Sequence, residues 1–233
     1  MAIKPILFNT EMVRAIMDGR KSCTRRLVKF LSGENPRWTG YIKDGLMLYN
    51  GKNEPCIRKA PYQPGDLLYV RETWERFECW NCEGDERGNC TKEPKKSVLD
   101  KTCGCYMYRA TDEISGDAKW RPSIHMPKEA ARIWLKVTDV RVERLQEITE
   151  DQTEEEGFLF TPPCLHMTGE NYCDIDGPCT SEIKYCDMSA GELFGKVLWN
   201  STIKKSDLDR YGWDPNPWVW VIEFERCEKP EGV

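Results

Sequence analysis

The sequence predicts an α+β protein, in which a curved sheet or small β-barrel is flanked by a few short helices. Three patterns indicate the sheet. The nearly continuous apolar run 67–71 follows a Pro-Gly-Asp turn and suits a buried strand. Apolar residues alternate over 133–142, as in a half-buried strand, and 218–224 is the clearest strand of the chain. Strands and helices follow each other in mixed order without internal repeats.

Capping signals place the helices between these strands. After a short strand at 6–8, Asn9 and Thr10 can cap a helix over 11–18, and Gly19 follows where a left-handed C-terminal cap belongs. A proline opens a short helix over 127–132. Capping boxes predict one helix after Thr149, ending near residue 157, and another over 189–199.

Composition limits the class of protein. The chain has 233 residues, 39% of them hydrophobic and 31% charged, which excludes intrinsic disorder. No run of about 18 apolar residues predicts a membrane span, and the apolar start is too short for a secretory signal. We expect a soluble, cytoplasmic protein. We also expect one domain over 1–233, interrupted by two cysteine-rich segments at 78–105 and 159–188.

Charge is distributed unevenly along the chain. The net charge is −5, but the first 60 residues hold twelve Lys and Arg against five Asp and Glu. They therefore carry +7 and the rest of the chain carries −12. A basic N-terminal quarter can present a face that attracts phosphate.

Eight of the twelve cysteines predict structural zinc. Without a secretion signal, thiolates on metal are favoured over disulfides. The first set is Cys79, Cys82, Cys103 and Cys105, whose two close pairs suit tetrahedral zinc, with Cys90 as a possible replacement. The second, more widely spaced set is Cys164, Cys173, Cys179 and Cys186, with His166 as a possible substitute. The alternative is reduced surface thiols. No organic cofactor is expected.

Three segments hold candidate site residues. In the turn 19–26, a desolvated Lys21 could act as a base on Thr24, whereas the plainer interpretation is a solvated basic turn. Arg71, Glu72 and Trp74 end a buried strand and could line a cleft or form a surface ion pair. Of the carboxylates at 154–156, at most one faces a pocket, because consecutive helical side chains diverge by about 100°.

Taken together, several segments resemble the ASCH domain family, which has a PUA-like fold. The similarity rests on KPILF at 4–8, GRKSCTRR at 19–26, GDLLYVRETW at 65–74, WRPSIHMP at 120–127, LQEIT at 145–149 and NPWVWV at 216–221. The longer form resembles versions carried by bacteriophages and prophages.

The resemblance implies a small β-barrel with a cleft for RNA or a modified nucleobase. Some members hydrolyse N4-acetylcytidine, using the Lys and second Thr of a Gly-Arg-Lys-Thr-x-Thr turn and a later Glu. Lys21, Thr24 and Glu156 match these catalytic positions, with Glu155 as the rival carboxylate and Ser22 in place of the first Thr. Lys21 would then activate Thr24 for attack on the acetyl carbonyl, and Glu156 would protonate the leaving amine.

Two departures from the compact hydrolases leave other functions open. The chain is about twice as long, and its additional arginines favour a phosphate-bearing ligand. A non-catalytic reader could hold a splayed-out base on aromatic side chains, and a metal-independent ribonuclease could use Lys21 and His125. The predicted partner is RNA or a modified nucleoside or nucleotide, not a membrane. The ligand-binding candidates are Arg20, Arg25, Arg26, Arg71, Glu72, Trp74, Ser123 and His125.

Overall fold

The computed structural model describes residues 1–31, 41–43, 47–49, 54–78, 95–96, 103–114, 119–158 and 188–232. Its strands are β1 (Ile3–Leu7), β2 (Cys23–Leu27), β3 (Tyr41–Lys43), β4 (Met47–Tyr49), β5 (Leu67–Arg71), β6 (Trp74–Glu78), β7 (Lys95–Lys96), β8 (Cys103–Tyr108), β9 (Trp134–Arg144) and β10 (Trp218–Cys227). Its α-helices are α1 (Thr10–Met17), α2 (Glu150–Glu155), α3 (Ala190–Leu193), α4 (Asn200–Thr202) and α5 (Leu208–Tyr211). Shorter 3-10 turns cover Ser123–His125, Lys128–Ala130, Leu145–Glu147 and Lys205–Asp207.

The main sheet has five strands in the order β1-β5-β9-β10-β2. β1 and β5 are parallel, whereas β5 with β9 and β10 with β2 are antiparallel, so the sheet is mixed. The α+β class is confirmed. The predicted β-barrel is wrong. A barrel closes only when its two end strands pair, and in the described residues β1 and β2 lie at opposite ends of the sheet.

The outer edge of β2 has a different neighbour. Lys21 forms an isolated bridge with Glu156, and the backbone N–H of Ser22 donates to the carbonyl of Glu155 at 2.8 Å. The end of α2 therefore covers the beginning of the edge that barrel closure would need. Two smaller sheets have the orders β6-β8-β7 and β3-β4.

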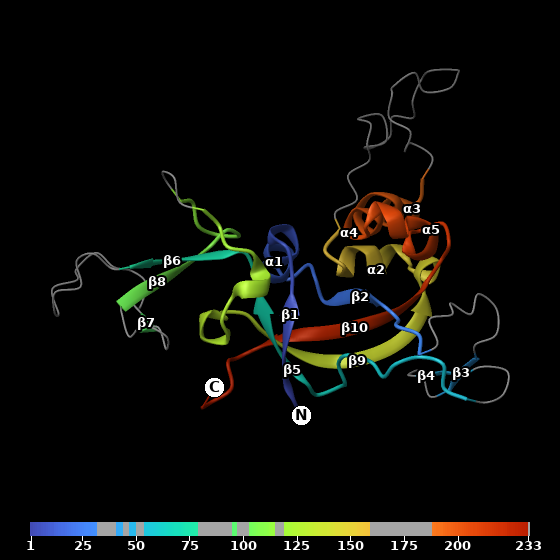
Figure 1. Cartoon of the computed structure of the whole chain (residues 1–233), viewed down its shortest axis with the longest axis horizontal. Helices are drawn as coiled ribbons and strands as arrows, with labels where there is room; N and C mark the ends of the chain where they lie inside the picture. The colour runs from blue at the N-terminus through green and yellow to red at the C-terminus, as the bar shows by residue number, and fades with distance from the viewer. Residues whose placement is uncertain are drawn as a thin grey trace, which may run out of the picture. The chain divides into compact units, whose positions relative to one another are not determined.

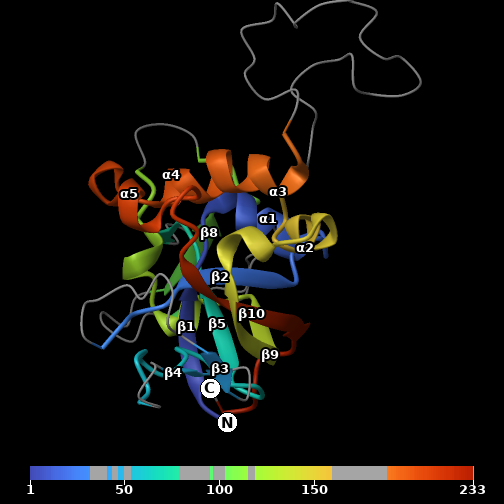
Figure 2. The same cartoon turned by 90° about the vertical axis from the view of Figure 1, so that its right-hand side faces the viewer.

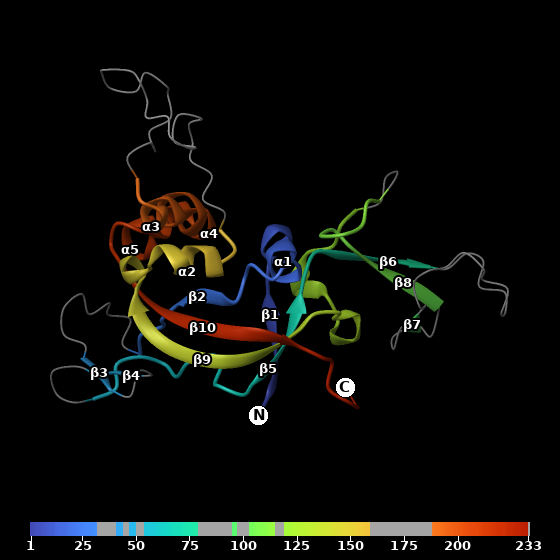
Figure 3. The ribbon, with the colours of Figure 1, turned by 180° about the vertical axis from the view of Figure 1, so that it is seen from behind.

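The chain divides into two compact units. Unit 1 comprises Met1–Asp18, Gly65–Lys136 and Glu225–Val233, and unit 2 comprises Gly19–Pro64 and Val137–Phe224. β9 and β10 run through both and are neighbours in the sheet (Figure 3). The single domain with two insertions stays a prediction, since both cysteine-rich segments lie largely outside the described residues.

Unit 1 contains β1 beside β5, and α1 (Figure 1). Val13 and Ile16 are the buried face of α1. An aromatic cluster adds Trp74, Tyr106, Tyr108 and Trp134 around Met126, each at most 8% exposed. Apolar burial on this scale drives the packing of the unit.

Unit 2 packs α2 to α5 against one face of its strands (Figures 1 and 2). Val219 and Val221 of β10 point into this layer, where they join Phe194, Trp199 and Trp213 in one core cluster. Gly195 allows the indole of Trp213 to lie against the helix, because a Cβ there would come within 1.8 Å of its Cε3 atom. This layer positions the polar residues described below.

The predicted helix caps are confirmed. The Asn9 side chain accepts from the N–H of Met12, and both capping boxes form, at Thr149 and at Ser189. The helix expected over 189–199 differs, because a π-helix over Phe194–Trp199 follows α3 and leads into α4. Within the described ranges, no helix is long and apolar enough to cross a membrane.

Candidate functional site

Lys21 and Glu156 form a buried ion pair in unit 2. Lys21 precedes β2 and Glu156 is the C-cap of α2, and their Nζ and Oε2 atoms lie 2.7 Å apart. Their side chains are 0% and 4% exposed. The ammonium also donates to the carbonyls of Cys23 at 2.7 Å and Glu156 at 2.8 Å. All three ammonium protons therefore have acceptors, and the solvated-turn interpretation is wrong for Lys21.

Arg25 extends the pair into a network. Its Nη1 donates to Glu156 Oε1 at 3.4 Å and its Nη2 to Gln152 Oε1 at 2.7 Å. The same Nη2 lies 3.7 Å from Glu143 Oε2 in an ion pair. One arginine thus links α2 to β9.

A second arginine continues the network along the sheet. Arg141 contacts the carboxylates of Glu143 and Glu223 and donates to Asp139 at 3.1 Å. Burial alone would lower the pKa of Arg141, but the hydrogen bonds to these three carboxylates outweigh it and raise the pKa. Arg141 therefore remains a permanent cation among three anions.

Two buried atoms of this network have no hydrogen-bond partner among the described residues. They are Nε of Arg25, a donor, and Oε2 of Glu143, an acceptor. Each unsatisfied buried group destabilises a fold by about 1–3 kcal/mol. The Glu143 side chain, at 19% exposed, is less buried than those of Arg25, Lys21 and Glu156. A ligand that supplies one acceptor and one donor would satisfy both atoms.

Thr24 lies on the other face of the sheet. In β2, Arg25 is paired with Val221, which packs under the helices, whereas Thr24 is paired with Ile222. Successive strand residues point to opposite faces, so the buried Thr24 side chain points away from the helical layer where Arg25 contacts α2. The structure brings Lys21 together with Glu156, but places Thr24 on the opposite face.

Cys23 shares the face of Arg25. Burial raises the pKa of its thiol to about 12, with a further contribution from the Glu156 carboxylate. A thiol so protonated is a poor nucleophile.

The other arginines of the turn also make internal contacts. Arg20 donates to the carbonyl of Gly157 at 3.3 Å. Burial lowers the pKa of Arg26, while the charges of Glu156 and Tyr62 raise it. Both arginines therefore have interactions within the fold.

The remaining ligand-binding candidates belong to unit 1. Glu72, 1% exposed, forms a two-pronged ion pair with Arg132, with both N···O distances 2.9 Å. Arg71 instead donates to the carbonyl of Met126 at 2.7 Å. The alternative of a surface ion pair at the end of β5 is therefore wrong for Glu72.

Trp74 is covered by a cation. The guanidinium of Arg121 lies 5.3 Å from the centre of the Trp74 ring, and the buried indole Nε1 has no hydrogen-bond partner among the described residues. Ser123 and His125 lie in a 3-10 turn, where Ser123 is half-buried and His125 is exposed.

Sequence reasoning missed several residues of these networks. Arg141 lies on the strand predicted over 133–142 and Glu143 directly follows it, and the period of two was the available signal that they share a face. Gln152, which lies in the helix predicted after Thr149, was not identified as a site residue. No pattern in the sequence indicated that Arg132 would pair with Glu72.

The predicted zinc ligands lie outside the described residues, apart from the backbone of Cys103 and Cys105 in β8. Among the side chains that the structure describes, no group of three or more His, Cys, Asp or Glu could hold a metal ion. Among the described residues, Cys23 and Cys227 are free thiols.

Comparisons of the chain with known protein families, with curated proteins and with solved structures gave no match.

Proposed function

We propose that the chain binds an RNA or a modified nucleobase through the network around Lys21, Arg25 and Glu156, as an ASCH-like protein with a PUA-like core. The observation that carries this proposal is that two buried atoms of the network, Arg25 Nε and Glu143 Oε2, have no hydrogen-bond partner among the described residues, although Oε2 lies 3.7 Å from Arg25 Nη2. One donor and one acceptor within a single network complement the edge of a nucleobase, which presents both kinds of group.

The charges of the network favour the base over the phosphates. Three cations face four carboxylates, so the network as a whole is not positive; its members are Lys21, Arg25, Arg141, Asp139, Glu143, Glu156 and Glu223. Phosphate recognition needs cations that are free of carboxylate partners. The proposed contact is therefore with an uncharged base, and phosphates contribute little.

Hydrolysis of N4-acetylcytidine is the second candidate. It is favoured by the 2.7 Å contact of Lys21 with Glu156, because these residues are 135 positions apart and match two of the three catalytic positions implied by the resemblance. The Thr24 hydroxyl would add to the acetyl carbon, the amide C–N bond would break to release cytidine with a proton from Glu156, and water would then hydrolyse the acetylated Thr24 to acetate. The position of Thr24 and the three occupied protons of Lys21 place this reaction behind simple binding.

We also propose structural zinc in the two cysteine-rich segments. The sulfur-rich sets leave no obvious open position for a catalytic water, so their role would be to hold these segments together. Metal analysis of the purified full chain tests this, with one or two zinc ions per chain expected. A metal-free chain in which these cysteines react freely with thiol reagents contradicts it.

One experiment distinguishes binding from hydrolysis. Full chain is titrated with N4-acetylcytidine, cytidine and a short RNA containing either base, and each mixture is then analysed by chromatography. Saturable binding without release of cytidine is expected. Glu156→Gln should weaken binding at least about tenfold, since it loosens Arg25, whereas the exposed neighbour variant Glu155→Gln should not.

Thr24→Val is the matched test of catalysis. It removes the hydroxyl from the opposite face and should leave binding unchanged. Release of cytidine by the unmodified chain and its loss in Thr24→Val would replace the binding proposal by the hydrolase. Failure to bind any of these ligands would overturn both.

A further inference from the structure

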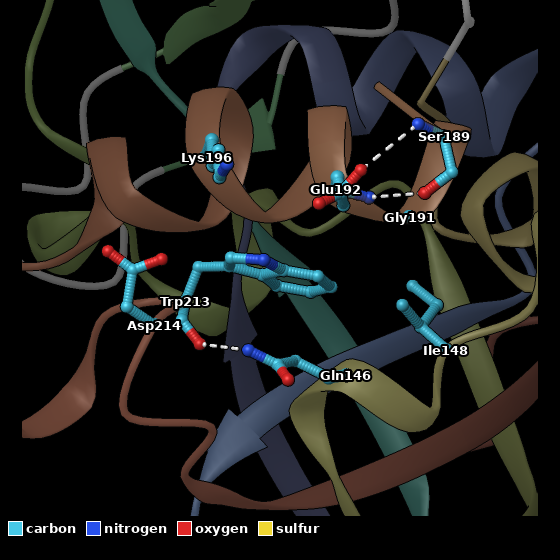
Figure 4. A pocket seen from close by; sticks show the side chains of 8 residues that line it. All are labelled: Gln146, Ile148, Ser189, Gly191, Glu192, Lys196, Trp213 and Asp214. Carbon is cyan, nitrogen blue, oxygen red and sulfur yellow. Dashed lines mark hydrogen bonds between the residues drawn. The ribbon is translucent and has the colours of Figure 1, made fainter. Parts of the chain in front are cut away.

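The two capping boxes of unit 2 differ at their third helical residue. In α3, the Glu192 carboxylate accepts the backbone N–H of Ser189 at 3.3 Å and has no other partner among the described residues (Figure 4). In α2, Gln152 Oε1 accepts the backbone N–H of Thr149 at 3.2 Å and also the Nη2 donor of Arg25 at 2.7 Å. A capping box needs the contact with the backbone N–H but no contact with an arginine. The contact with Arg25 therefore has another role.

The contacts of Gln152 fix the direction of its side-chain amide. Both neighbours of Oε1 are donors, so the oxygen has to face them and the NH2 group cannot. At 2.7 Å, the contact with Gln152 is also the shortest polar contact of the Arg25 guanidinium in the described part of the chain. A neutral amide oxygen is thus the closest acceptor of an arginine that also lies near the carboxylates of Glu143 and Glu156.

This contact holds Arg25 away from Glu143. The Arg25 Nη2 atom lies 2.7 Å from Gln152 Oε1 but 3.7 Å from Glu143 Oε2, which is beyond hydrogen-bond distance. Without the amide oxygen, the opposite charges of Arg25 and Glu143 would draw the two groups together. Glu143 Oε2 would then accept from the guanidinium, and the acceptor that the proposed ligand needs would be lost. Competition by Gln152 accounts for a buried carboxylate oxygen that has no hydrogen bond although an arginine lies beside it.

The same contact sets the direction of the Arg25 Nε donor. A guanidinium group is planar, so two held Nη atoms determine where its Nε–H bond points. Glu156 Oε1 holds Nη1 at 3.4 Å, and Gln152 Oε1 holds Nη2 at 2.7 Å. Loss of the Gln152 oxygen would leave the plane held by Glu156 alone, and the guanidinium would turn toward Glu143.

We propose that Gln152 is the positioning residue of the ligand site around Arg25. Its amide oxygen keeps Arg25 and Glu143 apart, so that Arg25 Nε and Glu143 Oε2 both stay available to the ligand. The inference rests on the proposed function, because the ligand is the one that the network binds. Gln152 itself touches no ligand in this role and acts through Arg25. The side-chain oxygen carries the role, and the helix cap and the volume of the side chain do not.

Three variants of the full chain test this role by calorimetric titration with N4-acetylcytidine. Gln152→Met fills a similar volume without an acceptor and should weaken binding about tenfold. Gln152→Glu keeps an oxygen for Arg25 and should stay within about threefold of the unmodified chain. Thr149→Ala removes the cap hydroxyl that accepts the Gln152 N–H, but it removes no acceptor of Arg25 and should leave binding unchanged.

Other roles of Gln152 would give different patterns in the same titrations. Equal weakening in Gln152→Met and Thr149→Ala would mean that only the helix cap matters. Equal weakening in Gln152→Met and Gln152→Glu would mean that the NH2 group contacts the ligand directly. Unchanged binding in a Gln152→Met chain with native circular dichroism would leave the side chain no role in binding. Each of these three results overturns the proposal.

A measurement without ligand separates this inference from the proposed function. Glu143→Gln should lower the urea midpoint of unfolding further in the Gln152→Met chain than in the unmodified chain, because Arg25 depends on Glu143 only when the amide oxygen is absent. Equal shifts in both chains overturn the positioning role. If the unmodified chain binds no nucleobase but the two shifts differ, the proposed function fails and the positioning of Arg25 by Gln152 stands.

Discussion

Replacing Glu156 by glutamine tests whether the Lys21 network stabilises unit 2 as the contacts indicate. The carboxylate lies 2.7 Å from the Lys21 ammonium and 3.4 Å from Arg25. At an effective dielectric constant of about 20, these separations correspond to attractions of about 6 and about 5 kcal/mol. Desolvation of the buried charges offsets much of this sum. Removing one member of a buried pair therefore lowers the free energy of unfolding by about 3–5 kcal/mol.

Equilibrium unfolding in urea at neutral pH measures this loss. Glu155→Gln is the matched control, since Glu155 is exposed and its side chain should contribute less than about 0.5 kcal/mol. Lys21→Met, alone and together with Glu156→Gln, completes a double-mutant cycle in which we expect coupling of at least about 2 kcal/mol. If Glu156→Gln costs no more than Glu155→Gln, or if the cycle shows no coupling, the buried ion pair does not hold β2 to α2.

Three further predictions concern protonation, packing and metal. In the native state the pKa of the Cys23 thiol is about 12, whereas in the unfolded state it is the ordinary value near 9.0. Above pH 9 the unfolded chain therefore releases a proton that the native chain keeps, and the free energy of unfolding decreases. Between pH 8 and about 10.5, urea unfolding should show this free energy falling about 2 kcal/mol more in the unmodified chain than in Cys23→Ala. Gly195→Ala should lower the free energy of unfolding by about 1–3 kcal/mol and change the near-ultraviolet circular dichroism of Trp213, whereas Val197→Ala, at an exposed position, should do neither. Chelation should make the two cysteine-rich segments sensitive to protease while the sheet signal persists, and global unfolding would contradict their description as insertions.

Local signals in the sequence predicted local structure well. The caps at Asn9, Thr149 and Ser189 form because each depends on a side chain and an N–H three residues away. The strands at 67–71 and 218–224 were equally clear, since both are bounded by turns and contain β-branched or aromatic residues. No tertiary contact was needed to identify them.

Closure of the sheet is a long-range property and was predicted wrongly. The sequence pattern of β2 is the same whether its outer edge meets another strand or the end of a helix. What decides it here is that the backbones around Ser22 and Glu155 hydrogen bond, which joins positions 133 residues apart. Hydrophobic periodicity contains no information about such a pairing.

The candidate site shows why residue identity and residue orientation must be predicted separately. The family resemblance suggested Lys21 and Glu156 with Glu155 as the rival carboxylate, and helix periodicity allowed at most one of three carboxylates to face a pocket; the structure places Glu156 beside Lys21. The orientation of Thr24 depends instead on where the turn ends and β2 begins, and a shift of one residue reverses the face of every side chain that follows. With β2 beginning at Cys23, odd-numbered Cys23 and Arg25 face the helices and Thr24 faces away. The same motif that predicts a nucleophile thus yields, in this register, a guanidinium beside the carboxylate, and the proposal that ranks binding of a base ahead of its hydrolysis rests on this arrangement.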